Sequence, residues 1–349
     1  MSLDLGFLVF LDHRRPDGAR QALRDGIRLF EHAERLGYDS GWVRVHHGAA
    51  DLTAPFPFLA AAAQHTSRIR LGTAVIPIGY EDPVRWVENA ATTDLLADGR
   101  LELGLSSGVP ALDDLGPAER RVLVEQKLTG VLDAFDAAER RAAELSAPEE
   151  GAPAPNGPVT AFRGDIASPV SPGLVHRLWY GAGSTASAIR AAERGLHLVL
   201  STIHGERTGP TLGHTQASLI RAYRDAFAEH HPERTPRVAI GRSILPIVDA
   251  ADRERFGGFK DFYDRLVTAD GRYTDGSGFA GQASPLHSGE PAAIIDALLE
   301  DPSLELADEL VLTPISELDL AAKKHVFASV AEHVAEPLRR HAAQRAIPA

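Results

Sequence analysis

The strongest constraint on the fold is an alternation of short apolar runs with longer amphipathic runs, repeated eight times along 349 residues. Short runs rich in aliphatic and β-branched residues are typical of buried strands, and the longer Ala-rich runs have the spacing of helices. Strand and helix in regular alternation predict βα units around a parallel sheet. Eight such units favour a closed (β/α)8 barrel of the α/β class, the TIM barrel, over an open sheet.

An open dinucleotide-binding sheet is disfavoured by a second observation. Its first strand would lead into a glycine-rich turn, whereas Leu11–Gly18 contains a single Gly. We therefore predict a TIM barrel, with residues 1–349 in one domain.

The expected strands are Leu3–Phe10, Ser40–Val45, Ile69–Ile76, Leu101–Leu105, Arg177–Gly181, Leu196–Ser201, Arg237–Leu245 and Glu309–Thr313. The expected helices follow them at Ala19–Leu36, Pro55–His65, Pro83–Ala97, Pro117–Leu145, Thr185–Arg194, Gly213–His231, Pro291–Leu299 and Glu317–Leu338. Several of these helices begin with Pro, whose missing N–H costs nothing in the first turn.

Two segments interrupt the alternation. Ala147–Pro172 is rich in Pro, Gly and Ala, and we expect it to be an insertion between the fourth helix and the fifth strand. Asp249–Gly289 follows the seventh strand and contains an expected helix, Arg253–Val267, and the Gly-rich run Asp270–Gly281. Active sites of TIM barrels lie at the carboxyl ends of the strands, so we expect this second insertion to be a mobile lid.

The composition disfavours several classes of partner. A formal charge of −12 opposes binding to nucleic acid, and no apolar run approaches the roughly 20 residues that would span a membrane. The chain has no Cys, so disulfides and thiolate metal sites are excluded. Leu3–Leu11 carries Asp4 and has no basic leader, which predicts a first strand and not a signal peptide. A cytoplasmic protein is expected.

His46 and His47 follow the second expected strand, where catalytic groups of a barrel gather. An imidazole can accept or donate a proton near neutral pH, so the pair is a candidate for acid–base catalysis. The alternative is that one ring packs against the rim of the barrel and the other is solvated. We expect no metal here, because adjacent residues of an extended segment point to opposite sides.

Two small-residue loops also follow strands. Gly181–Ser187 leads from the fifth strand into a helix, so its backbone N–H groups could bind a phosphate. The alternative, which the run taken alone favours, is an ordinary Ser/Thr N-cap. Gly104–Gly108 ends the fourth strand in the same manner and permits a close approach of some other group.

Several segments together resemble the luciferase-like monooxygenases, in order and at the family's separations. They are Ala33–Ser40, Trp42–His47, Ile69–Pro77, Asp82–Pro83, Leu95–Gly104, Ala191–Ser201 and Ser288–Pro291. The resemblance covers most of the chain, and the two insertions are the least similar parts.

The resemblance implies a flavin site and its residues. A non-proline cis peptide is expected between Ala74 and Val75, beneath the flavin ring, and His46 matches the family's catalytic His, with His47 beside it. The expected cofactor-binding residues are Thr73, Ala74, Val75, Ser106, Ser107, Gly183, Ser184, Thr185 and Ser187. Ser184, Thr185 and Ser187 would form the phosphate site.

Three residues depart from the family's pattern. Val45 stands where an acidic residue usually precedes the His pair, and Ser107 stands where the luciferases carry an Arg that reaches the phosphate. Asp82 replaces a His that luciferase has before Pro83, so luminescence with long-chain aldehydes is not implied.

The implied activity is oxygenation of a small organic substrate with O2 and reduced FMN. A separate flavin reductase is expected to supply the FMN, because the chain has no dinucleotide fingerprint. A homodimer is also expected. Two alternatives keep the fold: hydride transfer with a deazaflavin, or a non-catalytic flavin-binding or accessory subunit.

Overall fold

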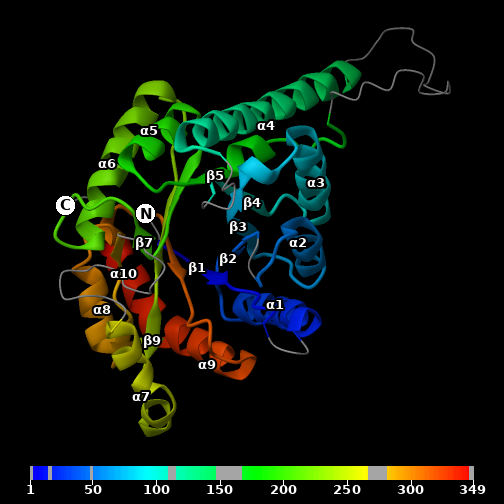
Figure 1. Ribbon diagram of the computed structural model, residues 1–349. Helices are drawn as coiled ribbons and strands as arrows, with labels where there is room; N and C mark the ends of the chain where they lie inside the picture. The colour runs from blue at the N-terminus through cyan, green and yellow to red at the C-terminus, as the bar shows by residue number, and fades with distance from the viewer. Residues whose placement is uncertain are drawn as a thin grey trace.

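The centre of the molecule is a closed barrel of eight parallel strands (Figure 1). The computed structural model describes residues 3–14, 18–47, 50–108, 115–146, 167–265 and 281–345. The barrel strands are β1 (Asp4–Val9), β2 (Ser40–Val43), β3 (Arg70–Pro77), β4 (Leu101–Ser106), β5 (Leu178–Gly181), β6 (His197–Leu200), β8 (Val238–Arg242) and β12 (Glu309–Leu312). They pair in that order, and β12 pairs with β1 to close the ring. The predicted TIM barrel is confirmed.

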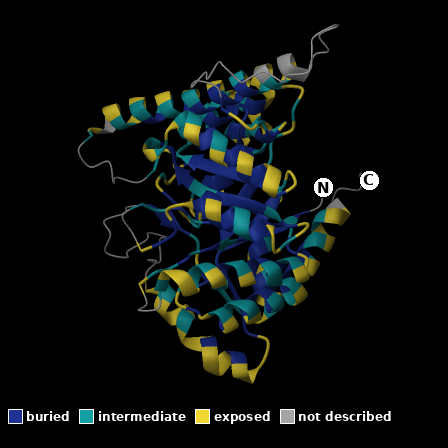
Figure 2. Ribbon diagram, turned by 90° about the vertical axis from the view of Figure 1, so that its right-hand side faces the viewer, coloured by how far each residue is buried: buried dark blue, intermediate teal, exposed yellow. Residues whose placement is uncertain are grey.

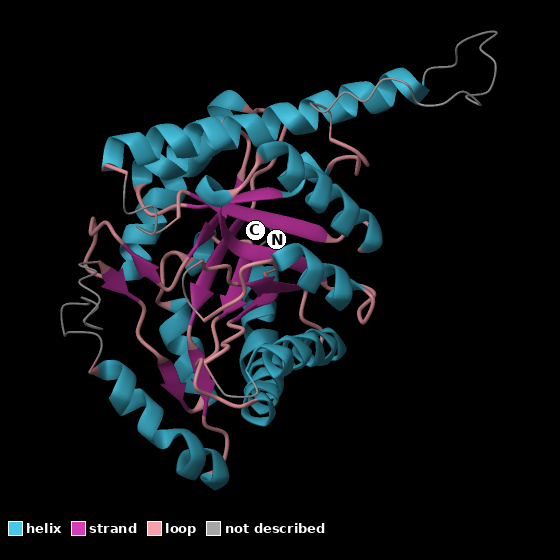
Figure 3. Ribbon diagram, turned by 45° about the vertical axis from the view of Figure 1, so that its right-hand side comes forward, coloured by secondary structure: helices cyan, strands magenta, loops and turns pink. Residues whose placement is uncertain are grey.

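Helices surround the barrel, and the longest of them, α4, extends beyond the others (Figure 3). The helices are α1 (Gly18–Arg35), α2 (Pro55–Ala63), α3 (Pro83–Leu96), α4 (Pro117–Ser146), α5 (Thr185–Glu193), α6 (Leu212–His230), α7 (Ala250–Asp264), α8 (Pro291–Leu299), α9 (Leu320–Val330) and α10 (Glu336–Arg345). Short 3-10 helices cover Ile78–Tyr80, Leu174–Arg177 and Leu304–Leu306. Among the described residues, no helix is long and apolar enough to cross a membrane.

The last expected helix, Glu317–Leu338, differs from the observed elements. Helix α9 begins only after Asp319, whose side chain accepts a hydrogen bond from the N–H of Ala322 and so caps it. A π-helical turn, Ala331–Ala335, then joins α9 to α10.

Two small sheets outside the barrel were not expected from the sequence. Strand β7 (Ile203–His204) pairs antiparallel with β10 (Gln282–Ala283), and β9 (Ile244–Pro246) pairs parallel with β11 (His287–Gly289). The expected seventh strand, Arg237–Leu245, is therefore two strands. The barrel strand ends at Arg242, and from Ser243 onward the backbone pairs with β11 in place of β12.

The two expected insertions are described only in part. Residues 147–166 of the first and 266–280 of the second lie outside the described residues. The second of these ranges holds nearly all of the Gly-rich run Asp270–Gly281 within the expected lid, Asp249–Gly289. The described start of the second insertion is α7, three residues earlier than predicted. Asp249 caps that helix by accepting a hydrogen bond of 2.8 Å from the N–H of Asp252.

Buried residues lie along the barrel strands and on parts of the surrounding helices (Figure 2). Apolar side chains form two clusters, one between the barrel and the helices and one inside the barrel. Phe7 of β1 packs outward against Phe30 of α1, with ring centroids 4.9 Å apart, so alternate residues of β1 face inward. The inner cluster is Trp42, Trp179, Val199, Ala239 and Val311. The barrel is thus filled with side chains along its middle.

The amino-terminal end of the barrel is closed by charged side chains. Arg70 forms ion pairs of 2.9 Å with Asp4, Glu102 and Glu309. Arg237 contacts the same three carboxylates at 2.9–3.2 Å. Glu102 and Glu309 are buried, and burial raises the pKa of both Glu102 and Asp4. This group, called the barrel-floor network below, lies at the end of the barrel opposite the expected site.

Candidate functional site

The His pair lies at the carboxyl end of β2 with polar atoms that have no protein partner. His46 Nδ1 and His47 Nε2 are buried and accept or donate no hydrogen bond. The backbone N–H of His46 donates to the carbonyl of Leu52 at 3.0 Å, which fixes the segment after the strand. Buried polar atoms of this kind usually have a partner, so a ligand or water is the expected one.

The two rings differ in their surroundings. His47 stacks on Tyr80, with centroids 4.5 Å apart and planes inclined by 30°. Burial, together with the neighbouring His46, lowers the pKa of His47. The stacking of His47 agrees with the alternative in which one ring packs against the rim, and His46 remains the candidate for proton transfer.

The peptide bond between Ala74 and Val75 is cis, as predicted. It lies in a bulge of β3, because the pairing with β4 shifts by one residue between Thr73 and Ile76. Ala74 and Val75 are partly exposed, whereas Thr73 and Ile76 are buried. The Thr73 hydroxyl donates to the carbonyl of Gly104 and accepts from its N–H, both at 3.0 Å, so it is fully used within the sheet.

Glycines on the next two strands make room for this bulge. A Cβ added to Gly104 would lie 2.4 Å from the carbonyl oxygen of Thr73 and 2.9 Å from Val75 Cγ1. A Cβ added to Gly181 would lie 3.0 Å from the same Val75 methyl. The bulge therefore depends on residues that only the folded barrel brings beside it.

We expect Gly104→Ala to lower the free energy of unfolding by about 2 kcal/mol, because the added methyl group meets backbone that cannot move aside without breaking the sheet. Denaturant unfolding of the variant would measure the loss. Gly183→Ala is the matched control, since an added Cβ there meets nothing within 4 Å. Equal stability of the two variants would contradict the assigned role of Gly104.

The two serines after β4 are engaged within the protein. Ser106 Oγ accepts a hydrogen bond of 3.1 Å from the N–H of Gly108. Ser107 is exposed, and its hydroxyl bonds to Tyr180, whose pKa is raised by burial. Neither contact shows a cofactor role, which for both serines remains a prediction.

The expected phosphate loop forms a complete N-cap of α5. Ser184 Oγ accepts from the N–H of Ser187, and Ser187 Oγ accepts from the N–H of Ser184, each at 3.1 Å. This is the capping alternative, and it leaves the two hydroxyls satisfied. Gly183 is exposed at the entry to the helix.

A carboxylate already sits at this helix terminus. Glu206, two residues beyond β7, accepts hydrogen bonds from the N–H of Thr185 at 2.8 Å and from its hydroxyl at 3.0 Å. The start of α5 therefore binds an anion, as a helix dipole favours, and Thr185 supplies the donors. Sequence reasoning missed Glu206, because its contact joins two loops that are distant along the chain.

A cavity of about 380 Å³, called the mouth cavity below, opens at the carboxyl ends of β1, β2, β6, β8 and β12. It is lined by Phe10, Asp12, Arg14, Arg44, Ala50, Asp51, Thr202, Ser243, Tyr263, Thr313, Pro314 and Ser316. None of the residues expected to bind the cofactor belongs to this mouth cavity. The barrel residues that line the cavity follow β1, β2, β6, β8 and β12. The residues expected to bind the flavin lie on or after β3, β4 and β5.

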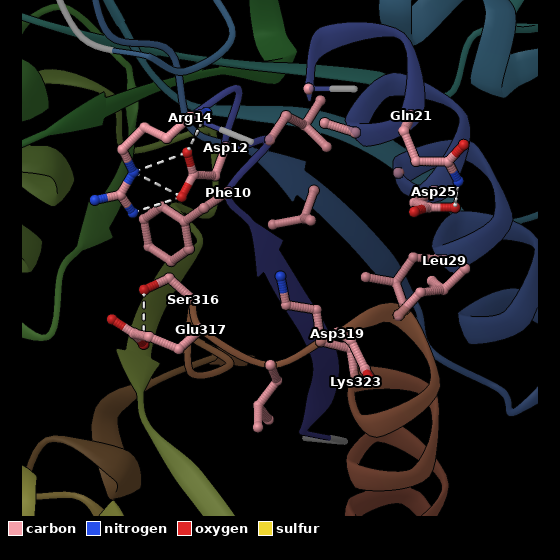
Figure 4. Close-up of a pocket in the computed structure, with 17 residues that line it drawn as sticks. Phe10, Asp12, Arg14, Gln21, Asp25, Leu29, Ser316, Glu317, Asp319 and Lys323 are labelled. Atoms are coloured by element: carbon pink, nitrogen blue, oxygen red, sulfur yellow. Dashed lines mark hydrogen bonds and ion pairs between the residues drawn. The ribbon is translucent and has the colours of Figure 1, made fainter. Parts of the chain in front are cut away.

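A second cavity, of about 350 Å³, lies between α1 and the start of α9 (Figure 4). Phe10, Asp12, Arg14 and Ser316 line both cavities. Arg14 donates to both carboxylate oxygens of Asp12, and these hydrogen bonds lower the pKa of Asp12 to about 2. A charged pair therefore stands where the two cavities adjoin.

Comparison with known proteins begins with the family. A model of the luciferase-like monooxygenase family matches residues 3–310. Limonene 1,2-monooxygenase of Rhodococcus erythropolis is 34% identical over 113 residues, which are 32% of this chain and 29% of that protein. The alignment thus spans less than a third of this relative.

Solved structures share the fold. The oxygenating constituent of 3,6-diketocamphane monooxygenase from the CAM plasmid of Pseudomonas putida, in complex with FMN, matches with a TM-score of 0.65 and 16% identity over 96% of this chain and 99% of that one. An F420-dependent secondary alcohol dehydrogenase, in complex with an F420–acetone adduct, matches with a TM-score of 0.62 and 16% identity over 95% of this chain and 98% of that one.

Proposed function

The chain belongs to the luciferase-like monooxygenase family, and on that premise we propose that this oxidoreductase uses reduced FMN and O2 to oxygenate a small organic substrate. The observation that carries the proposal is the arrangement along β2 and β3. His46, with a buried Nδ1 that has no partner, follows one strand, and the next strand carries the partly exposed residues Ala74 and Val75. A flat ring with a polar edge fits such a surface.

The anion site at α5 suits the other end of FMN. Thr185 presents a backbone N–H and a hydroxyl, and the carboxylate of Glu206 stands in for the phosphate that these donors would hold. FMN binding in this position requires that the phosphate replace the Glu206 carboxylate. Ser184 and Ser187 then support the site by fixing the first turn of the helix.

The protein's part in the reaction is to bind, orient and transfer a proton. Reduced FMN, when bound, supplies the two electrons with which O2 is activated. His46 can accept a proton at Nδ1 as the imidazole and return it as the imidazolium. The filled barrel interior beneath Ala74 and Val75 keeps water from that side of the site.

A separate reductase is proposed to supply the reduced flavin. The chain has no dinucleotide fingerprint, and the structurally similar protein of Pseudomonas putida is itself an oxygenating constituent. To test the activity, the purified chain would be combined with a flavin reductase, NADH, FMN and ¹⁸O2 over a panel of small carbonyl, amine and sulfur compounds. Absence of ¹⁸O-labelled product from every compound would refute the proposal.

Hydride transfer with a deazaflavin is the second candidate, favoured by the F420-dependent neighbour of the same fold. Titration of the apo protein with FMN and with the deazaflavin separates the two. Tight binding of the deazaflavin alone would replace the oxygenase proposal.

Glu206→Gln is expected to tighten FMN binding about tenfold, because the substitution removes a negative charge that competes with the phosphate at Thr185. Riboflavin has no phosphate, so its affinity should change by less than about twofold. Fluorescence titration with both flavins measures the difference. An equal change for the two would place the phosphate elsewhere.

A further inference from the structure

The mouth cavity contains two arginines whose donors are used to different extents. Arg14 gives both Nε and Nη2 to Asp12, and its side chain is 71% exposed. Arg44 gives only Nε, which lies 2.6 Å from Asp51 Oδ2. The terminal nitrogens of Arg44 form no hydrogen bond with any residue that the structure describes.

The Arg44 guanidinium is held in place from two sides. Asp51 is buried, and its Oδ1 accepts hydrogen bonds from the N–H of Leu11 at 3.1 Å and of Leu52 at 2.9 Å. The Arg44 Cζ also lies 4.6 Å from the centroid of the Phe10 ring, a cation–π contact. The side chain is therefore fixed before any ligand arrives, which lowers the entropy that a ligand must overcome.

An arginine fixed in this way, with two unused donors, matches a carboxylate. Guanidinium and carboxylate can form two parallel charge-assisted hydrogen bonds, which neutral groups cannot equal in strength. Asp51 has its hydrogen bonds satisfied by the protein, so it orients Arg44 without competing for the terminal nitrogens.

We propose that the mouth cavity binds the carboxylate of the substrate through the terminal nitrogens of Arg44. This inference rests on the proposed function and names the substrate class, a small carboxylic acid. A volume of about 380 Å³ suits a small ligand, and the lining also includes the rings of Phe10 and Tyr263 and several hydroxyl groups. The carboxylates of Asp12 and Asp51 lie in the same lining, and each is paired with an arginine. A substrate with a ring and a carboxylate fits the two aromatic rings and the terminal nitrogens of Arg44.

The alternative anion is the phosphate of FMN. The residues expected to hold that phosphate follow β5, whereas the cavity is lined from β1, β2, β6, β8 and β12 and from α7. The positions favour the substrate, and the effect of Arg44 on FMN affinity distinguishes the two sources.

The test uses benzoate as the probe and benzamide as its neutral isostere, with affinities measured by calorimetry on the chain without flavin. The wild-type chain should bind benzoate at least about tenfold more tightly than benzamide. Arg44→Gln should abolish that difference by weakening benzoate alone. Arg44→Lys keeps the positive charge but loses the planar guanidinium with its two parallel donors. This variant should retain only part of the preference for benzoate.

Arg85→Gln is the matched control, because it removes one positive charge from an exposed pair on α3. It should leave the preference for benzoate intact, and thermal unfolding would verify that each variant folds. Equal affinities of benzoate and benzamide in the wild type, or a preference that survives Arg44→Gln, would overturn the proposal.

FMN and riboflavin are titrated against the same variants. A loss of FMN affinity larger than that of riboflavin in Arg44→Gln would assign Arg44 to the phosphate and overturn the substrate role. If the wild type binds FMN but shows no preference for benzoate, this inference fails and the proposed function stands. If it binds neither flavin, the proposed function fails.

Discussion

His46→Ala is expected to lower turnover about 10²-fold or more, the scale on which enzymes lose rate with a general acid or base. Folding should be nearly unchanged, because His46 Nδ1 has no protein partner to lose. Product formation in the reductase-coupled assay measures the rate, and flavin fluorescence measures binding.

His46→Asn adds a second variant that keeps a polar side chain but cannot transfer a proton near neutral pH. It should be as slow as His46→Ala. His47→Ala should have a smaller effect on turnover, because that ring is stacked on Tyr80. Wild-type turnover in both His46 variants would return His46 to a structural role.

Arg237→Met is expected to lower the free energy of unfolding by about 3–5 kcal/mol at pH 8, because it leaves three carboxylates of the barrel-floor network with one guanidinium. The control is Arg255→Met, which breaks an exposed pair with Asp319 and should cost no more than about 1 kcal/mol. Denaturant unfolding of both variants gives the comparison.

The loss of unfolding free energy in Arg237→Met, relative to the wild type, should become smaller as the pH falls from 8 to 5. Burial already raises the pKa of Glu102, and removal of Arg237 raises it further. A carboxyl group with a raised folded-state pKa contributes stability below its unfolded pKa and loses it as the pH rises through the folded value, so acid favours the variant. A deficit independent of pH would contradict this account.

The barrel could be predicted from the sequence because its strands are buried on both faces and therefore appear as continuous apolar runs. The same property produced the error at Arg237–Leu245. Ile244 and Leu245 are as buried as the barrel residues before them, and only the change of partner from β12 to β11 separates β9 from β8.

The candidate site could likewise be predicted only in part. The cis peptide at Ala74–Val75 could be expected from the family resemblance, because a local motif accompanies it. The contact of Glu206 with Thr185 could not, since it joins the loops that follow two neighbouring strands. The position of Asp51 beside Arg44 could not either, since Asp51 is also held by the N–H of Leu11 from another strand. The role of Ser184 and Ser187 could not be decided from the sequence, because the same run of residues is typical of an N-cap and of a phosphate site.

The two small sheets outside the barrel join loops that would otherwise be independent. The stretch 282–289 pairs through β10 with β7, next to Glu206, and through β11 with β9, next to Ser243 of the mouth cavity. The N–H of His287 also donates to the carbonyl of Ser243 at 2.9 Å. If a phosphate displaces Glu206 as proposed, we expect the movement to reach the mouth cavity through residues 282–289, which border both sites. Cofactor and proposed substrate would then bind cooperatively, and linkage requires each to change the affinity of the other by the same factor.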